Sequence, residues 1–314
     1  MFGAIRGLNR LGAAAAPVSN LPGRVAPLRA VMARTVGIAR ERPLPRFERE
    51  TLLRWHRRRS GGPDGTTGPG TRGDLVFLAD SFTTFTEPAI GRAAIELLER
   101  AGWRVRLEGG GCCGRASISK GLLDDARDKA AGLVTRLALE AERGVPIVGC
   151  EPSCILTLGE EHPSLLKGDP RAEAVGRQAR LVDAVLLEAI DDGALRLDPA
   201  SPVSGRRIVF HGHCHQKALT GTAATVELLR RIPGADVVEL DAGCCGMAGS
   251  FGFEAEHYDL SMKIGGMRLF PALRGEPADT LVAATGVSCR QQIAQGVERV
   301  ARHPVELVRE ALAP

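Results

Sequence analysis

A tetrapeptide, Gly-Cys-Cys-Gly, occurs twice in this sequence of 314 residues, at 111–114 and at 243–246. The residues around it repeat in the same order. An apolar run, a helical stretch and an alternating segment precede each tetrapeptide, and a second helical stretch and apolar run follow it. The paired apolar runs are 75–78 with 208–210 and 147–150 with 281–284, and the later run of each copy leads into Ser-Cys. Two copies of one order of strands and helices predict an internal duplication.

Strands that alternate with helices predict the fold class. Parallel strands need crossover connections long enough to hold a helix, so this order predicts an α/β architecture with a small parallel sheet in each copy. The length and the 44% content of hydrophobic residues suffice for two domains with cores of their own. We therefore expect two tandem duplicated Cys-Cys-Gly domains, with the cysteines at the carboxyl edge of each sheet, where such folds place ligands.

Composition predicts the domain boundaries. Residues 61–73 are rich in Gly, Pro and Thr and contain no large apolar residue, which predicts a flexible linker. The first domain is expected at 74–195 and the second at 206–314, separated by the Pro- and Ser-containing segment 198–205. Residues 1–60 are expected to form a basic N-terminal arm or connector.

The basic arm carries 13 Arg and 3 Glu, a net charge of +10. We expect it to dock onto a partner chain instead of packing on the cysteine domains. Nucleic acid is not the expected partner, because 36 Arg against 5 Lys in the whole chain indicates a compositional bias toward arginine. The apolar stretch 11–18 is short and broken by Pro17, so it is not typical of a signal peptide, and no run is long enough for a transmembrane segment. The expected location is cytoplasmic, or peripheral at the inner face of the membrane.

All eight cysteines lie inside the duplicated scheme. The first copy holds Cys112, Cys113, Cys150 and Cys154, and the second holds Cys214, Cys244, Cys245 and Cys289. Adjacent side chains point to opposite sides of an extended chain, so a turn made possible by the flanking glycines is needed to bring both thiols to one site. A helix that begins just after them would favour thiolate over thiol. Four thiolates in each copy predict a soft, all-sulfur site that suits an iron–sulfur cluster or zinc.

Three other interpretations compete with iron–sulfur ligation. Structural zinc sites usually carry paired Cys-x-x-Cys knuckles, and this sequence has none. A metal-free dithiol–disulfide centre would need a strained bridge between adjacent cysteines. Buried cysteines without a function would not be confined to duplicated positions. Iron–sulfur ligation is therefore the favoured interpretation, with zinc as the alternative.

Three stretches resemble a known family: 211–217 (His-Gly-His-Cys-His-Gln-Lys), 243–252 (Gly-Cys-Cys-Gly-Met-Ala-Gly-Ser-Phe-Gly) and 286–292 (Gly-Val-Ser-Cys-Arg-Gln-Gln). They resemble the cysteine-rich CCG domain of heterodisulfide reductase, which also occurs in the iron–sulfur components of glycolate oxidase and of lactate-utilisation systems. The chain resembles in particular the C-terminal iron–sulfur part of FAD-linked D-2-hydroxyacid dehydrogenases of the D-lactate or glycolate type. Residues 42–45 (Arg-Pro-Leu-Pro) resemble the connector that follows a ferredoxin-like domain there, so the resemblance covers about residues 30 to 314.

The chain departs from the family pattern of five cysteines per copy. Asp80 and Ser81 stand where the first copy should have its leading cysteine, and Thr285 stands at the second-copy position that corresponds to Cys150. Four thiols per copy suffice for an ordinary [4Fe-4S] cluster and are too few for the non-cubane cluster that the family pattern implies. We therefore expect one or two [4Fe-4S] clusters, with the second site, which keeps its leading cysteine, binding the tighter and functionally decisive one.

The resemblance also implies partners. The flavin domain and the ferredoxin-type cysteine runs of such proteins are missing, so the chain is expected to be a fragment or a separate iron–sulfur electron-transfer subunit of an oxidoreductase. FAD is expected on a dehydrogenase partner chain that oxidises a 2-hydroxyacid, and a ferredoxin-type or quinone-linked protein is the expected acceptor. The alternative function is a zinc-stabilised structural or interaction subunit without redox turnover.

Histidines flank the leading cysteine of the second copy. His211, His213 and His215 alternate along what the pattern predicts to be an extended segment, so they would share one face, ready to ligate metal or pass protons. His213 and His215 are the candidate catalytic residues, although all three could simply bond loop carbonyls. Two further expectations concern nearby residues: His257 and Tyr258 are expected to be packing residues, and Lys217 and Arg290 either offset cluster charge or are solvated.

Overall fold

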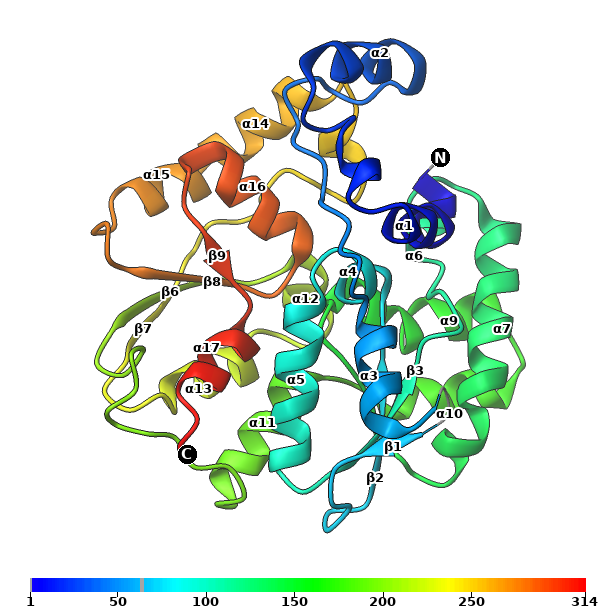
Figure 1. Cartoon of the computed structure of the whole chain (residues 1–314), viewed down its shortest axis with the longest axis vertical. Coiled ribbons are helices and arrows are strands. Elements are labelled where there is room, and N and C mark those ends of the chain that lie inside the picture. The colour runs from blue at the N-terminus through cyan, green and yellow to red at the C-terminus, as the bar shows by residue number, and fades with distance from the viewer. Residues whose placement is uncertain (1, 63–64) are drawn as a thin grey trace.

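Two sheets form the framework of the structure, a computed structural model that describes residues 2–62 and 65–314. The first has five strands in the order β1-β3-β2-β4-β5, and the second has four in the order β7-β6-β8-β9 (Figure 1). The first sheet comprises β1 (Thr66–Thr67), β2 (Asp74–Leu78), β3 (Arg104–Glu108), β4 (Ile147–Gly149) and β5 (Ala179–Leu181). The second comprises β6 (Arg207–His211), β7 (Asp236–Glu239), β8 (Leu281–Ala284) and β9 (Ala301–Arg302).

The duplication predicted from the sequence is confirmed by strand order and register. If β2, β3, β4 and β5 are matched to β6, β7, β8 and β9, the two sheets have the same order, and all of these strands are parallel. Phe77 pairs with Val148 in the first sheet, and Phe210 pairs with Ala283 in the second. The antiparallel edge strand β1 belongs to the first sheet alone.

Helices connect the strands and cover the sheets. The arm and first copy contain α1 (Ile5–Ala14), α2 (Ala26–Val36), α3 (Leu52–Ser60), α4 (Ser81–Phe85), α5 (Pro88–Arg100), α6 (Arg115–Ile118), α7 (Leu123–Glu142), α8 (Pro152–Ile155), α9 (Glu161–Leu165), α10 (Pro170–Gln178) and α11 (Val182–Asp191). The second copy contains α12 (Cys214–Leu219), α13 (Ala223–Arg230), α14 (Tyr258–Met267), α15 (Leu269–Arg274), α16 (Val287–Val297) and α17 (Pro304–Glu310). Pro88 opens α5, and Gly102, at a φ of +101°, turns the chain into β3, as the sequence predicts.

The two copies pack through equivalent helices. α5 of the first copy contacts α17 of the second, and α11 of the first contacts α13 of the second, in the middle of the molecule (Figure 1). Because α13 corresponds to α5 and α17 to α11, this contact has approximate twofold symmetry. Leu228, Val305 and Val308 of the second copy share one buried core with the first sheet. The copies therefore form one body, with apolar burial across their interface as the main stabilising contribution.

The basic arm packs on both copies, so the expectation that it stays off the cysteine domains is wrong. Leu52 on α3 is fully buried in the core of the first copy. The amide of Ala39 donates to the Phe253 carbonyl of the second copy at 2.8 Å, and the Arg42 side chain is only 1% exposed. Apolar side chains and the buried guanidinium of Arg42 thus help to hold the arm in place despite its charge. α2 differs, because none of its residues is buried.

The segment expected to be a linker contains an ordered part. Thr66–Thr67 pairs with β3, and Thr67 is buried there. Residues 63 and 64 of the expected linker lie outside the described residues. Within the part of the chain that the structure describes, none of the helices combines the length and apolar character needed to cross a bilayer.

Candidate metal centre

The cysteines of the second copy gather at the carboxyl ends of its strands, as the sequence predicts. β6 is followed by Cys214, the first residue of α12, and β7 is followed by the pair Cys244–Cys245. β8 is followed by Cys289 in the first turn of α16. Three separate loops therefore supply the four thiols, and parallel strands bring these loops to one edge.

Glycine makes the turn at each cysteine pair possible. Gly246 has a φ of +95°, and a Cβ there would lie 2.3 Å from the Ser261 carbonyl oxygen. Its amide donates to the Cys244 sulfur at 3.3 Å. Gly114 has the same role in the first copy, at a φ of +78°. The helix expected after each pair exists only in the first copy, as α6. In the second copy a loop with one 3-10 turn, η4 (Phe251–Phe253), leads to α14 at Tyr258, so the expectation of a helix directly after the pair is wrong there.

The four thiols of the second copy extend from the surface into the core. Cys214 and Cys244 are exposed, whereas Cys245 and Cys289 are buried, with their sulfur atoms 3.7 Å apart. The neighbouring Cys244 thiol raises the pKa of Cys214, with burial as the next cause. The Cys214 thiol in turn lowers the pKa of Cys244. Cys214 thus contacts Cys244, Cys244 contacts Cys245, and Cys245 contacts Cys289. These contacts place the four sulfur atoms around one site.

The first copy gathers three of its four cysteines. Cys113 and Cys154 share one buried cluster, and the Cys113 thiol is the main cause that raises the pKa of Cys112. Cys150 lies on the other side of β4, in the core between the two copies, where burial raises its pKa well above the ordinary value. Asp80 caps α4 by accepting bonds from the amides of Phe82 and Thr83 and from the Thr83 hydroxyl. The role of Cys150 as a ligand stays a prediction.

His211 lies beside the buried half of the second site. It ends β6 and is fully buried on the same face as Val209, and this face packs against Cys245 and Cys289. One ligand atom from each of His211, Cys245 and Cys289 lies within 4.8 Å of the other two. Among the described residues, no nitrogen or oxygen atom hydrogen-bonds to either ring nitrogen of His211.

Of the other two histidines, His213 still has an extended backbone, whereas His215 does not, because α12 begins at Cys214. The expected shared extended face is therefore wrong for His215, whose ring instead stacks on that of His213. His213 caps this helix, and its Nδ1 accepts a bond from the His215 amide at 3.2 Å. The Nε2 atom of His213 lies 3.9 Å from Glu151, and that of His215 lies 3.5 Å from Glu161. Both histidines of the second copy thus face carboxylates of the first copy, so they lie at the junction of the two sites.

Glu151 links the two copies beside both sites. Its carboxylate accepts bonds from the Ser153 hydroxyl at 2.8 Å and from the amide of Val287, the first residue of α16, at 2.9 Å. Burial raises its pKa, and His213 and Arg290 oppose this rise. Arg290 is buried, not solvated, and pairs with Glu87 of the first copy at 2.6 Å. Position 151 carried no sequence signal, since a glutamate after a strand is usually exposed.

Two arginines of the arm reach the two sites, one each. Arg6 donates to the carbonyls of Ala79 and Gly109, which follow β2 and β3 of the first copy. Arg42 donates to the Gly252 carbonyl at 2.7 Å and to Gln292 at 2.7 Å in the second copy. Each guanidinium brings a positive charge close to a group of cysteines, and this charge would attract thiolates there. Arg42 begins the Arg-Pro-Leu-Pro connector noted in the sequence, whereas no sequence pattern distinguishes Arg6 from the other arginines of the arm.

The remaining candidates have structural partners. The Lys217 ammonium donates to the Gly243 carbonyl at 3.3 Å, next to the cysteine pair. His257 bonds Glu254 and stacks on Phe251. The Tyr258 ring lies under the Arg42 guanidinium at 4.9 Å. The packing role expected for His257 and Tyr258 therefore fits their contacts.

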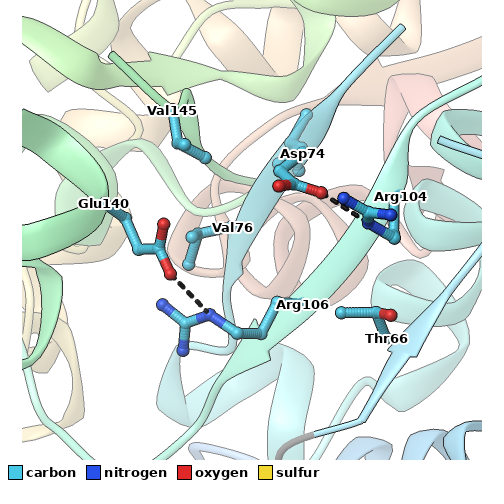
Figure 2. A pocket seen from close by; sticks show the side chains of 8 residues that line it. Thr66, Asp74, Val76, Arg104, Arg106, Glu140 and Val145 are labelled. Carbon is cyan, nitrogen blue, oxygen red and sulfur yellow. Dashed lines mark hydrogen bonds and ion pairs between the residues drawn. The ribbon is translucent and has the colours of Figure 1, made fainter. Parts of the chain in front are cut away.

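A pocket of about 210 Å³ opens at the opposite end of the first sheet (Figure 2). Asp74 and Arg104, the first residues of β2 and β3, form an ion pair there at 2.5 Å. Arg106 and Glu140 lie 3.6 Å apart on the other side of the pocket. The charged groups shown in Figure 2 thus neutralise one another. Because the strands are parallel, this pocket is remote from the cysteines.

Comparison with known proteins places the two copies of the chain in a family. The model of the CCG cysteine-rich domain matches the sequence twice, at residues 78–159 and 208–294. The chain belongs to the CCG cysteine-rich domain family. Each match spans the strands and loops that carry one set of cysteines, so the family repeat and the structural duplication coincide.

Three relatives show what kind of protein carries such domains. The chain is 29% identical over 300 residues to one of the subunits of anaerobic glycerol-3-phosphate dehydrogenase of Escherichia coli, covering 95% of this chain and 73% of that protein. It is 29% identical to D-2-hydroxyglutarate dehydrogenase of Escherichia coli, covering 76% of this chain and 22% of that protein. It is 30% identical to lactate utilization protein A of Geobacillus kaustophilus, covering 56% of this chain and 72% of that protein. The predicted class, an iron–sulfur electron-transfer component of an oxidoreductase with CCG domains, is confirmed by these relationships.

Proposed function

We propose that this CCG-family chain holds a [4Fe-4S] cluster in its second copy and passes electrons from a flavoprotein dehydrogenase to a quinone or ferredoxin-type acceptor. The observation that carries the proposal is the convergence of four free thiols from three loops in that copy. The first copy offers three thiols together and a fourth apart, so its cluster is the weaker one.

The donor set of the second copy fits an iron–sulfur cluster. Thiolates are the ligands that such clusters require, and a cluster supplies reversible one-electron transfer when it is bound. Cys245 and Cys289 are buried and shielded from water, whereas Cys214 and Cys244 are exposed. An exposed side gives an electron donor or acceptor a short approach to the site, and a buried side limits solvent access, which tunes the potential.

The chain's own residues prepare the site for negative charge. Cys289 lies in the first turn of α16, where unpaired amides and the positive helix end favour thiolate. Arg42 brings a buried cation to the same copy, and Lys217 holds the loop before the cysteine pair. These groups act by charge and by position, without moving a proton themselves.

The substrate class and the partner follow from the relatives. Their names refer to glycerol 3-phosphate, 2-hydroxyglutarate and lactate, small anions that each carry a secondary alcohol. We propose that the partner is an FAD-containing protein that oxidises such an alcohol. The exposed apolar side chains of α2, including Leu28 and Val31, form the surface of the arm that best suits a protein partner.

Metal analysis of protein purified without oxygen tests the proposal. Iron and sulfide in equal amounts, a brown colour and broad absorbance near about 400 nm are expected, with about four iron per chain for one cluster and eight for two. Colourless protein with stoichiometric zinc, even after anaerobic reconstitution with iron and sulfide, would contradict it and support the structural alternative.

A further inference from the structure

His211 is a fully buried imidazole whose polar neighbours are thiols, and these surroundings indicate what it binds. Both ring nitrogens lack a hydrogen bond to any nitrogen or oxygen atom of the described residues. The groups beside it are the sulfur atoms of Cys245 and Cys289, within 4.8 Å, and the Cys289 thiol hydrogen-bonds to the ring. Because sulfur is a weak hydrogen-bonding group, a buried imidazole with sulfur partners alone is poorly satisfied, which indicates a function or an absent ligand.

The first copy provides an internal comparison. Aligning Phe77 with Phe210 places Leu78 at the position of His211, each as the last residue of the central strand. Leu78 packs in one buried cluster with Cys113 and Cys154, and His211 lies correspondingly beside Cys245 and Cys289. The fold therefore accepts an apolar residue at this position, and the imidazole of the second copy serves a purpose other than packing.

Thr285 cannot take the same role. It stands at the position of Cys150, and its hydroxyl donates to Gln216 at 2.9 Å. Gln216 in turn donates to Thr225 at 2.7 Å, and Thr225 donates to Asp183 at 2.6 Å. This chain of bonds occupies the threonine hydroxyl, whereas the ring nitrogens of His211 bond to no nitrogen or oxygen atom of the described residues.

We propose that His211 ligates the cluster of the second copy through a ring nitrogen, beside the buried Cys245 and Cys289. Because a four-iron cluster takes four protein ligands, the imidazole replaces one of the two exposed thiols, Cys214 or Cys244, and the centre is a mixed cysteine–histidine site. The inference rests on the proposed function. A neutral imidazole in place of a thiolate leaves the cluster less negative, so the second centre has the higher reduction potential of the two. Electrons that enter the chain therefore collect at the second site.

Pulsed EPR of the full-length, anaerobically reconstituted and reduced chain, labelled with ¹⁵N-histidine, tests this directly. A strong nitrogen coupling typical of a metal-bound imidazole is expected in the wild-type chain. It should be unchanged in the control His257→Leu, because the His257 side chain is bonded to Glu254 and stacked on Phe251 and is not among the residues grouped with the thiols. It should vanish in His211→Cys, with iron content retained and the potential of the second centre lowered, because cysteine supplies a thiolate instead.

A second variant separates ligation from packing. His211→Leu copies the first-copy residue Leu78, so the fold should tolerate it, and it should lose the coupling together with part or all of the second-site iron. A nitrogen coupling that persists in either His211 variant, or that is missing from a wild-type chain with full iron, overturns the ligation while leaving the iron–sulfur function intact. Absence of iron from the wild-type chain overturns both.

Discussion

The two copies share strand order, register and turn chemistry, yet they differ at the end of each central strand. The first copy has Leu78 followed by the helix cap Asp80, whereas the second has His211 followed by His213 and Cys214. At these positions the first copy thus has an apolar side chain and a carboxylate, whereas the second copy has imidazoles and a thiol. The comparison teaches that a duplicated scaffold can keep its framework while two or three positions decide how well each half holds a metal.

The largest expected effect distinguishes the two cysteine pairs. Cys245→Ser should abolish most of the electron transfer, a drop of about tenfold or more, because serine is a poor substitute for a buried thiolate ligand. Cys113→Ser should cost less and leave the second cluster intact. Iron content, low-temperature EPR and reduction by a flavoprotein donor should be measured for both. If Cys113→Ser proves the more damaging change, the first copy holds the working cluster.

The next largest effect concerns the junction between the copies. Arg290→Gln removes a buried cation and leaves Glu87 without its partner, which should reduce the free energy of unfolding by about 3–5 kcal/mol. Arg268→Gln is the matched control, because the Arg268–Asp241 pair is exposed and should contribute less than about 0.5 kcal/mol. Denaturant unfolding measures both. Equal losses would show that the junction does not depend on this ion pair.

A smaller effect should depend on pH. Burial raises the pKa of Asp183 from 3.8 to about 6, so the native state holds this proton more tightly than the unfolded chain. Its favourable contribution is complete below pH 4 and is lost as pH rises through 6. Asp183→Asn keeps an acceptor for Thr225 and removes the cost of ionisation. It should therefore stabilise the protein by about 2–3 kcal/mol at pH 7.5 and leave it unchanged near pH 4. Unfolding curves at both pH values check this, and a loss of stability at pH 7.5 would refute it.

The smallest expected effect compares the arm's two arginines. Arg6→Gln breaks two half-buried bonds to carbonyls and should cost about 1 kcal/mol. Arg42→Gln leaves several buried acceptors of the second copy unsatisfied and should cost more, about 2–3 kcal/mol. Thermal unfolding of the two variants ranks them. The reverse order would mean that the arm is held mainly by the first copy.

The sequence predicted the duplication, the strands and the cysteine loops, because these depend on local patterns. Period-two alternation within the strands carries further information about the cysteines. Val148 and Cys150 share one face of β4, and Val209 and His211 share one face of β6. This parity places Cys150 on the face of β4 opposite Ile147, and it places His211 on the same face as Val209, so both features were within reach of the sequence. The position of Cys154 depends instead on α8, which begins at Pro152.

Other features depend on contacts that no local pattern encodes. Arg42 bonds to Gln292 and Glu151 bonds to Val287, and both pairs are far apart in the sequence. The charge of the arm suggested solvent or a partner, but burial of Leu52 and Arg42 outweighs it. The start of α12 at Cys214, which takes His215 out of the extended segment, depends on the tertiary setting of the loop after β6.

The arm's placement has a consequence for biosynthesis. Arg42 is made 210 residues before Gly252 and 250 residues before Gln292, its partners in the second copy. Because synthesis runs from the N-terminal to the C-terminal side, Leu52 can join the core of the first copy before Arg42 meets its partners. The contacts of Arg42 with the second copy therefore form only after that copy has been synthesised, so the arm is fixed in two stages.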